Sequence, residues 1–159
     1  MADILVVYYS KTGHTKAMAE CIGKSAAQVE GANVTVRPVE EVSADDLLDY
    51  DGIIVGSPVY YGTMAAPLKA LIDASVKHHG KLDGKVGGVF SSSGVMGGGN
   101  ETTLMDIIGT LLVHGMVVKG VSRGPHYGPT CQGEPGEDAR RCCADYGRMV
   151  GELCVRLFG

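Results

Sequence analysis

The chain has 159 residues and a formal net charge of −4, with 45% hydrophobic and 20% charged residues. That length suits one globular domain, so we expect residues 1–159 to form a single unit. The mild charge and the scattered Lys and Arg exclude a basic surface for nucleic acid. No apolar run approaches the ~18 residues that span a bilayer, and no signal peptide precedes the first run. We therefore expect a cytoplasmic protein with no membrane partner.

Five cysteines are present, at Cys21, Cys131, Cys142, Cys143 and Cys154. Their number is odd and no pair has C-x-x-C spacing, so we expect free thiols rather than a disulfide framework. A metal site built from His126, Cys131, Cys142 and Cys143 is an alternative, but it lacks the paired short spacing of zinc motifs. We expect no metal, and we expect Cys143 to be a small core residue of a helix.

Apolar runs alternate with helical patterns along the whole chain. Short, β-branched runs predict strands at residues 4–9, 34–39, 52–56, 85–90 and 116–121. Apolar residues at helical spacing predict helices at residues 15–29, 65–74, 101–113 and from residue 137 onward, with a short turn at 47–48. Residues 122–136, rich in Gly and Pro, form the one long irregular stretch.

Strands that alternate with helices indicate an α/β fold with a parallel sheet covered on both faces. Because crossovers between parallel strands are right-handed, few topologies remain at this size. We expect a three-layer α/β/α sandwich of the flavodoxin-like kind, with five strands in the order 2-1-3-4-5.

The loop after the first strand carries hydroxyl groups and leads straight into a helix. It reads Ser10-Lys11-Thr12-Gly13-His14-Thr15. Hydroxyls and free N–H groups at a helix start form a site for a phosphate dianion, and glycine lets the backbone approach it closely. The alternative is that Thr12 or Thr15 is an ordinary N-cap. The spacing matches neither a nucleoside-triphosphate loop nor a Rossmann glycine fingerprint.

Two more unusual loops are expected at the same edge, where the carboxyl ends of parallel strands meet. Residues 57–64, after the third strand, place two adjacent tyrosines where they can face a planar ligand. Residues 91–99, after the fourth strand, hold glycines whose backbone can lie against a flat ring. Half-buried aromatics and a plain flexible loop are the alternatives for each loop alone. Three such loops at one edge predict a ligand site.

Several segments resemble flavodoxin-like NAD(P)H:quinone oxidoreductases of the tryptophan-repressor-binding-protein (WrbA) type. The resemblance covers the chain from residue 4 to its end, and its first element is the phosphate loop Ser10-x-Thr12-Gly13-x-Thr15. The later matching segments are Gly56-Ser57-Pro58-Val59-Tyr60-Tyr61-Gly62-Thr63-Met64, Phe90-Ser91-Ser92-Ser93-Gly94 with Gly97-Gly98-Gly99, His114-Gly115-Met116 and Tyr127-Gly128.

The resemblance implies flavin mononucleotide (FMN) as the cofactor. The residues that would bind its phosphate are Ser10, Lys11, Thr12, Gly13, His14 and Thr15. The residues that would line its ring are Pro58, Val59, Tyr60, Tyr61, Gly62, Thr63, Ser92, Ser93, Gly94, Val95, Gly97, Gly98 and Gly99. His114 would lie near both flavin and substrate, where a donor stabilises negative charge on the reduced ring. The alternative for His114 is a solvent-facing residue at a helix C-terminus.

This chain departs from the family pattern at three places. Tyr60 stands where the family often has an arginine, and the glycine loop is one residue longer around Val95 and Met96. The family places a tryptophan over the flavin from the segment before the fourth strand, but this chain has no tryptophan. Its segment reads His78-His79-Gly80-Lys81, and we expect those histidines to be exposed loop residues rather than parts of the pocket.

We expect an enzyme that uses FMN to pass two electrons from NAD(P)H to a quinone in a ping-pong cycle. The resemblance implies a homodimer or homotetramer in which a neighbouring subunit completes the pocket. The alternative is a flavodoxin-type electron carrier between protein partners, although the mild acidity and His114 favour the enzyme. A phosphoacceptor receiver domain is excluded, because Ser10-Lys11 and Ser57-Pro58 stand where its acidic residues would be.

Overall fold

Six parallel strands form one sheet in the computed structural model, which describes residues 1–159. The strands follow the order β2-β1-β3-β4-β5, and β6 also pairs with β4. Their bounds are β1 Ala2–Tyr8, β2 Ala32–Pro38, β3 Gly52–Pro58, β4 Val86–Ser93, β5 Val117–Val118 and β6 Thr130–Gln132. The predicted α/β fold and strand order are confirmed.

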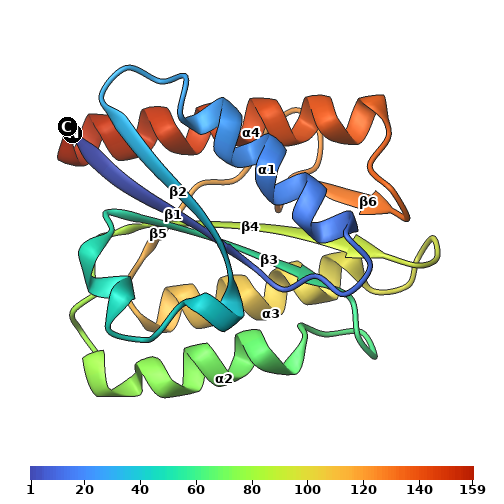
Figure 1. Cartoon of the computed structure of the whole chain (residues 1–159), viewed down its shortest axis with the longest axis horizontal. Helices are drawn as coiled ribbons and strands as arrows, with labels where there is room; N and C mark the ends of the chain where they lie inside the picture. The colour runs from blue at the N-terminus through green and yellow to red at the C-terminus, as the bar shows by residue number, and fades with distance from the viewer.

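Helices cover both faces of the sheet (Figure 1). Helices α1 (His14–Ala26) and α4 (Glu137–Phe158) lie on one face, and α2 (Ala66–Ala74) and α3 (Asn100–Val113) lie on the other. Three short 3₁₀ turns complete the chain: η1 Val39–Glu41, η2 Asp46–Asp49 and η3 Ser75–His78. The three-layer sandwich is therefore as expected. None of these helices combines the length and the apolar character that a membrane span requires.

The central strand β1 shows why the sequence folds this way. Successive side chains of a strand point to opposite faces, and every residue from Ile4 to Val7 is fully buried. Leu5 and Val7 pack into the core beneath α2 and α3, whereas Ile4 and Val6 pack into the core beneath α1 and α4. A continuous apolar run is what a strand with two buried faces requires.

The fifth strand position differs from the expectation. One strand was expected at residues 116–121, but β5 covers only Val117–Val118, and β6 lies inside the stretch expected to be irregular. Both strands pair with β4. Strand β5 pairs near the start of β4, at Val86, and β6 pairs near the end of β4, at Ser91–Ser93. The interrupting segment contains Pro125 and Pro129, which have no N–H group for a ladder hydrogen bond.

Candidate functional site

The three predicted loops meet at the carboxyl edge of the sheet, on the right of Figure 1. Two hydrogen bonds to Ser92, at the end of β4, join them. The Val59 N–H, after β3, donates to the Ser92 carbonyl at 2.8 Å. The hydroxyls of Thr15, in the first turn of α1, and Ser92 are 2.8 Å apart and buried. Segments distant in sequence are therefore joined into one platform, formed by residues 10–15, 57–64 and 91–99.

The N-terminus of α1 is open toward this platform. Gly13 is the N-cap at φ 98°, no side chain caps the helix, and no acidic residue stands in its first turn. The first helical bond runs from the Ala17 N–H to the Gly13 carbonyl, so the N–H groups of His14, Thr15 and Lys16 have no partner within the helix. These donors and the positive end of the helix dipole favour an anion.

The N-cap alternative for Thr12 and Thr15 is wrong. Thr12 is exposed and caps nothing, while the buried Thr15 hydroxyl is paired with Ser92. Ser10 instead orders the loop, because its Oγ accepts the Gly13 N–H at 3.1 Å. Lys11 is exposed beside them and adds a positive charge.

The two tyrosines lie in a tight, strained turn formed by residues 60–63, the tyrosine turn. The backbone groups of Tyr60 and Thr63 bond to each other in both directions, at 2.9 and 3.2 Å. Tyr61 and Gly62 between them have φ of 50° and 79°, and Tyr61 is the only non-glycine residue in the chain with a positive φ. Tyr61 is wholly exposed. An aromatic residue in this region of backbone space is strained, and the strain persists only where surrounding contacts fix the backbone.

Tyr60 is held from the other side by Tyr9, which follows β1. The two rings meet edge to face, with centroids 6.0 Å apart and an interplanar angle of 79°. Burial, followed by the neighbouring Tyr9, raises the pKa of Tyr60 above its ordinary value. Tyr60 is therefore an uncharged phenol at neutral pH, unlike the arginine common at this position in the resembling family.

The glycine loop after β4 is folded back on itself. The Gly98 N–H and the Ser93 hydroxyl both donate to the Val95 carbonyl, at 3.1 and 3.0 Å. Gly99 must be glycine, because its φ is 120° and a Cβ there would lie 2.9 Å from Cα of Gly62. The glycine loop and the tyrosine turn therefore touch through their backbones. Gly94 and Gly97 are exposed at the tip.

Asn100, which the sequence analysis did not single out, belongs to this platform. Its amide nitrogen donates to Ser93 Oγ at 2.9 Å, while its Oδ1 is buried without a partner. An unpaired buried carbonyl calls for a donor from a ligand or water. The signal available in sequence was its position directly after three glycines and at the start of α3.

Within one chain, His114 does not lie beside the other predicted site residues. It is the C-cap of α3, whereas Gly99 at the platform is the N-cap of the same helix. A 14-residue helix is about 21 Å long, so α3 separates them. The residue sits instead at the amino edge of the sheet.

The ring of His114 also makes a hydrogen bond at the amino edge of the sheet. The Ser75 hydroxyl donates to the Ile72 carbonyl at 2.6 Å, so the contact of 2.8 Å between Ser75 Oγ and His114 Nε2 must be donated by the imidazole. Burial, and then His79, lowers the pKa of His114, which leaves the ring neutral at neutral pH. Nδ1 is buried without a partner. The alternative of a solvent-facing residue does not describe this half-buried, hydrogen-bonded ring.

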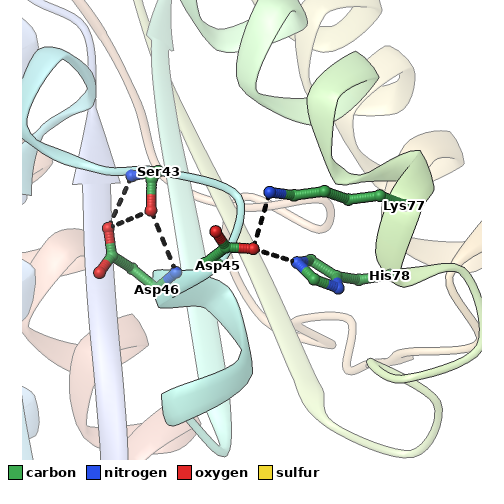
Figure 2. A network of polar contacts seen from close by, with 5 residues as sticks. All are labelled: Ser43, Asp45, Asp46, Lys77 and His78. Carbon is green, nitrogen blue, oxygen red and sulfur yellow. Dashed lines mark hydrogen bonds and ion pairs between the residues drawn. The ribbon is translucent and has the colours of Figure 1, made fainter.

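Of the two histidines before β4, only His79 is exposed as expected. His78 Nε2 lies 2.6 Å from Asp45 Oδ1, and its side chain is only 12% exposed. Lys77 binds the same carboxylate oxygen at 2.7 Å, as Figure 2 shows. These contacts fasten η3 to the segment between η1 and η2, away from the carboxyl edge.

The residues of the alternative metal site are not arranged to bind an ion. No group of three His, Cys, Asp or Glu residues is placed to bind one ion. Burial raises the pKa of Cys131 to about 11, which disfavours the thiolate that a metal needs. Cys143 is fully buried in the core between α1 and α4, as predicted, and all five cysteines are free thiols.

Known proteins resemble this chain in sequence and in fold. A family model described as NADPH-dependent FMN reductase matches residues 38–124, which include the tyrosine turn and the glycine loop. A protein of Nitrobacter winogradskyi named NAD(P)H dehydrogenase (quinone) is 34% identical over 200 aligned positions, covering all of both chains. The chain belongs to the NADPH-dependent FMN reductase family. The resemblance to flavodoxin-like quinone oxidoreductases is thereby confirmed, and with it the enzyme class.

Two further relatives place the chain within this family of flavodoxin-like proteins. A flavodoxin of Aquifex aeolicus is 38% identical over 160 positions, covering 96% of this chain and 86% of that protein. A solved WrbA-like flavodoxin from Agrobacterium tumefaciens has a TM-score of 0.83 at 27% identity, covering 98% of this chain and 99% of the other. The family description names FMN and NADPH, and the name of the Nitrobacter relative includes NAD(P)H. These are the expected cofactor and co-substrate.

Proposed function

We propose that this protein is an FMN-dependent enzyme that reduces quinones with NAD(P)H. The observation that carries the proposal is the uncapped N-terminus of α1, bonded through Thr15 and Ser92 to the tyrosine and glycine loops. A phosphate site joined to an aromatic turn suits a phosphorylated planar molecule. The name of the Nitrobacter relative supports the choice of substrates.

The residues present fit FMN. The N–H groups at the start of α1, with the Ser10, Thr12 and Thr15 hydroxyls and Lys11, would hold its phosphate. Tyr60, Tyr61 and the glycine loop would flank its ring, and the unpaired Asn100 Oδ1 offers an acceptor to a ring N–H. When bound, FMN supplies the two-electron redox chemistry, and the protein supplies binding and orientation.

The overall reaction balances as NAD(P)H, a proton and a quinone giving NAD(P)⁺ and a hydroquinone. We propose that the two substrates use one site in turn, in a ping-pong cycle, because the tyrosine turn offers exposed aromatic surface that suits either substrate. The neutral Tyr60 and exposed Tyr61 would face either substrate with uncharged aromatic surface.

We further propose that the protein is a homodimer or homotetramer. Apolar side chains are exposed near His114 at the amino edge: Val76 (72%), Leu112 (56%), Val113 (73%) and Val117 (42%). Such a patch suits burial against a second copy. Only in such an assembly can His114 approach the FMN of another subunit, so its predicted catalytic role depends on the assembly. The cytoplasmic location expected from the sequence stays a prediction that cell fractionation would test.

An electron carrier is the second candidate, favoured by the relative named flavodoxin at 38% identity. Steady-state kinetics of the FMN-loaded protein separates the two. The enzyme oxidises NAD(P)H with a quinone as sole partner, and double-reciprocal plots at several quinone concentrations are parallel. Intersecting lines would contradict the ping-pong cycle. A protein that accepts electrons only when a separate reductase protein is added is a carrier.

A further inference from the structure

Two side chains of α3 fasten the turn formed by residues 60–63. The Thr63 hydroxyl donates to Asp106 Oδ2 at 2.5 Å, and the Thr102 hydroxyl lies 2.7 Å from the Gly62 carbonyl. Thr102 and Asp106 are four residues apart and therefore lie on one face of the helix. Asp106 is exposed, and its carboxylate makes no hydrogen bond or ion pair other than the one with Thr63.

The turn needs such support because Tyr61 disfavours the positive φ that it adopts there. Both central residues have positive φ, at 50° for Tyr61 and 79° for Gly62. A two-residue turn of this kind favours Asn-Gly or Gly-Gly, and an aromatic residue at its first central position is strained. Tyr61 gains nothing in return from packing, since its side chain is wholly exposed. The strain persists only where neighbouring contacts over-determine the backbone.

We propose that Asp106 is a positioning residue, which holds Thr63 and thereby keeps Tyr61 in the orientation that receives the cofactor ring and the quinone. The inference rests on the proposed function. The Asp106 carboxylate accepts the hydrogen bond that the Thr63 hydroxyl would otherwise donate to water, and this contact closes the turn. The aromatic face of Tyr61 is therefore in place before a ligand arrives. Preorganisation of this kind raises affinity without adding a contact to the ligand.

Two variants break the contact from its two sides. Asp106→Ala removes the acceptor and Thr63→Val removes the donor, while Asp106→Asn keeps an oxygen that can accept. Glu152→Ala is the control, because it removes an exposed carboxylate from α4. The first readout is hydrogen exchange of the Thr63 amide, which bonds to the Tyr60 carbonyl, in cofactor-free protein. The second is the Kd for FMN, from quenching of flavin fluorescence.

We expect Asp106→Ala and Thr63→Val each to speed Thr63 amide exchange and weaken FMN binding by about three- to ten-fold. The double variant should be no worse than either single one, since both remove one contact. Asp106→Asn should retain most of the affinity, and Glu152→Ala should change neither readout. All variants alter surface positions and should melt within a few degrees of the parent.

Unchanged exchange and affinity in both single variants would overturn the proposal, as would losses that simply add. If the parent protein binds no FMN, the proposed function fails. The exchange measurement still decides the role of Asp106 in that case, because it needs no cofactor.

Discussion

Tyr61 combines strain with exposure, and the two effects can be separated by substitution. A non-glycine residue in a disfavoured backbone region costs about 1–3 kcal/mol, and asparagine tolerates the left-handed region better than an aromatic residue does. We predict that Tyr61→Asn stabilises the cofactor-free protein by about 0.5–1 kcal/mol, a rise in Tm of about 1–4 °C, and weakens FMN binding.

The matched control for this substitution is Tyr127→Asn, which replaces a second exposed tyrosine whose φ is not positive. It should bring no gain in stability. Calorimetry of the cofactor-free proteins measures the first effect and flavin titration the second. A Tyr61→Asn variant that is less stable than the parent would show that the turn is not strained.

Sequence reasoning located residues better than it located their partners. The phosphate loop, tyrosine turn and glycine loop could be predicted, because turn residues and hydroxyls carry a local signal. Asn100 and Asp106 could not, because their roles depend on contacts across the fold to Ser93 and Thr63.

The ion cluster of Asp45, Lys77 and His78 ties two elements together, the segment before η2 and the turn η3 (Figure 2). Hydrogen bonds from Lys77 and then His78 lower the pKa of Asp45 below its ordinary value. A carboxylate with a lowered folded pKa stabilises the protein above its unfolded pKa, and this contribution is lost as the pH falls through the folded value.

We therefore predict that Asp45→Asn lowers Tm slightly at neutral pH, by less than about 3 °C, because the side chains of Asp45 and Lys77 are exposed. The difference from the parent should shrink as the pH falls below about 4. Thermal unfolding at a series of pH values measures this difference in Tm, with Asp49→Asn as the control on the same turn. A difference that grows toward acid pH would contradict the assignment.

At the scale of elements, periodicity predicted every helix and the first four strands to within a few residues. The fifth strand position could not be predicted, because a split strand looks like one strand followed by a loop. Only the pairing of β6 with the end of β4 reveals that Thr130–Gln132 completes the same edge.

For the whole molecule, the position of His114 makes assembly a requirement for its predicted role. We predict that the protein sediments as a dimer or tetramer and that Val113→Glu, at the exposed end of α3, shifts it to monomer with a large loss of quinone reduction. Lys24→Glu, an exposed charge change on α1, is the control and should leave the assembly intact. A parent protein that is monomeric and fully active would remove His114 from the reaction.

The central claim, that the start of α1 binds the phosphate of FMN, is tested most directly by comparing FMN with riboflavin, which lacks that phosphate. The measurement is a fluorescence titration of both flavins with the parent protein and with Thr12→Asp. That exposed substitution places a negative charge just before the helix. The charge interacts favourably with the helix dipole, but it repels a phosphate. We predict that Thr12→Asp weakens FMN binding by at least about ten-fold, leaves riboflavin binding unchanged and does not lower Tm. Absence of FMN binding by the parent, or equal effects on the two flavins, would contradict the account.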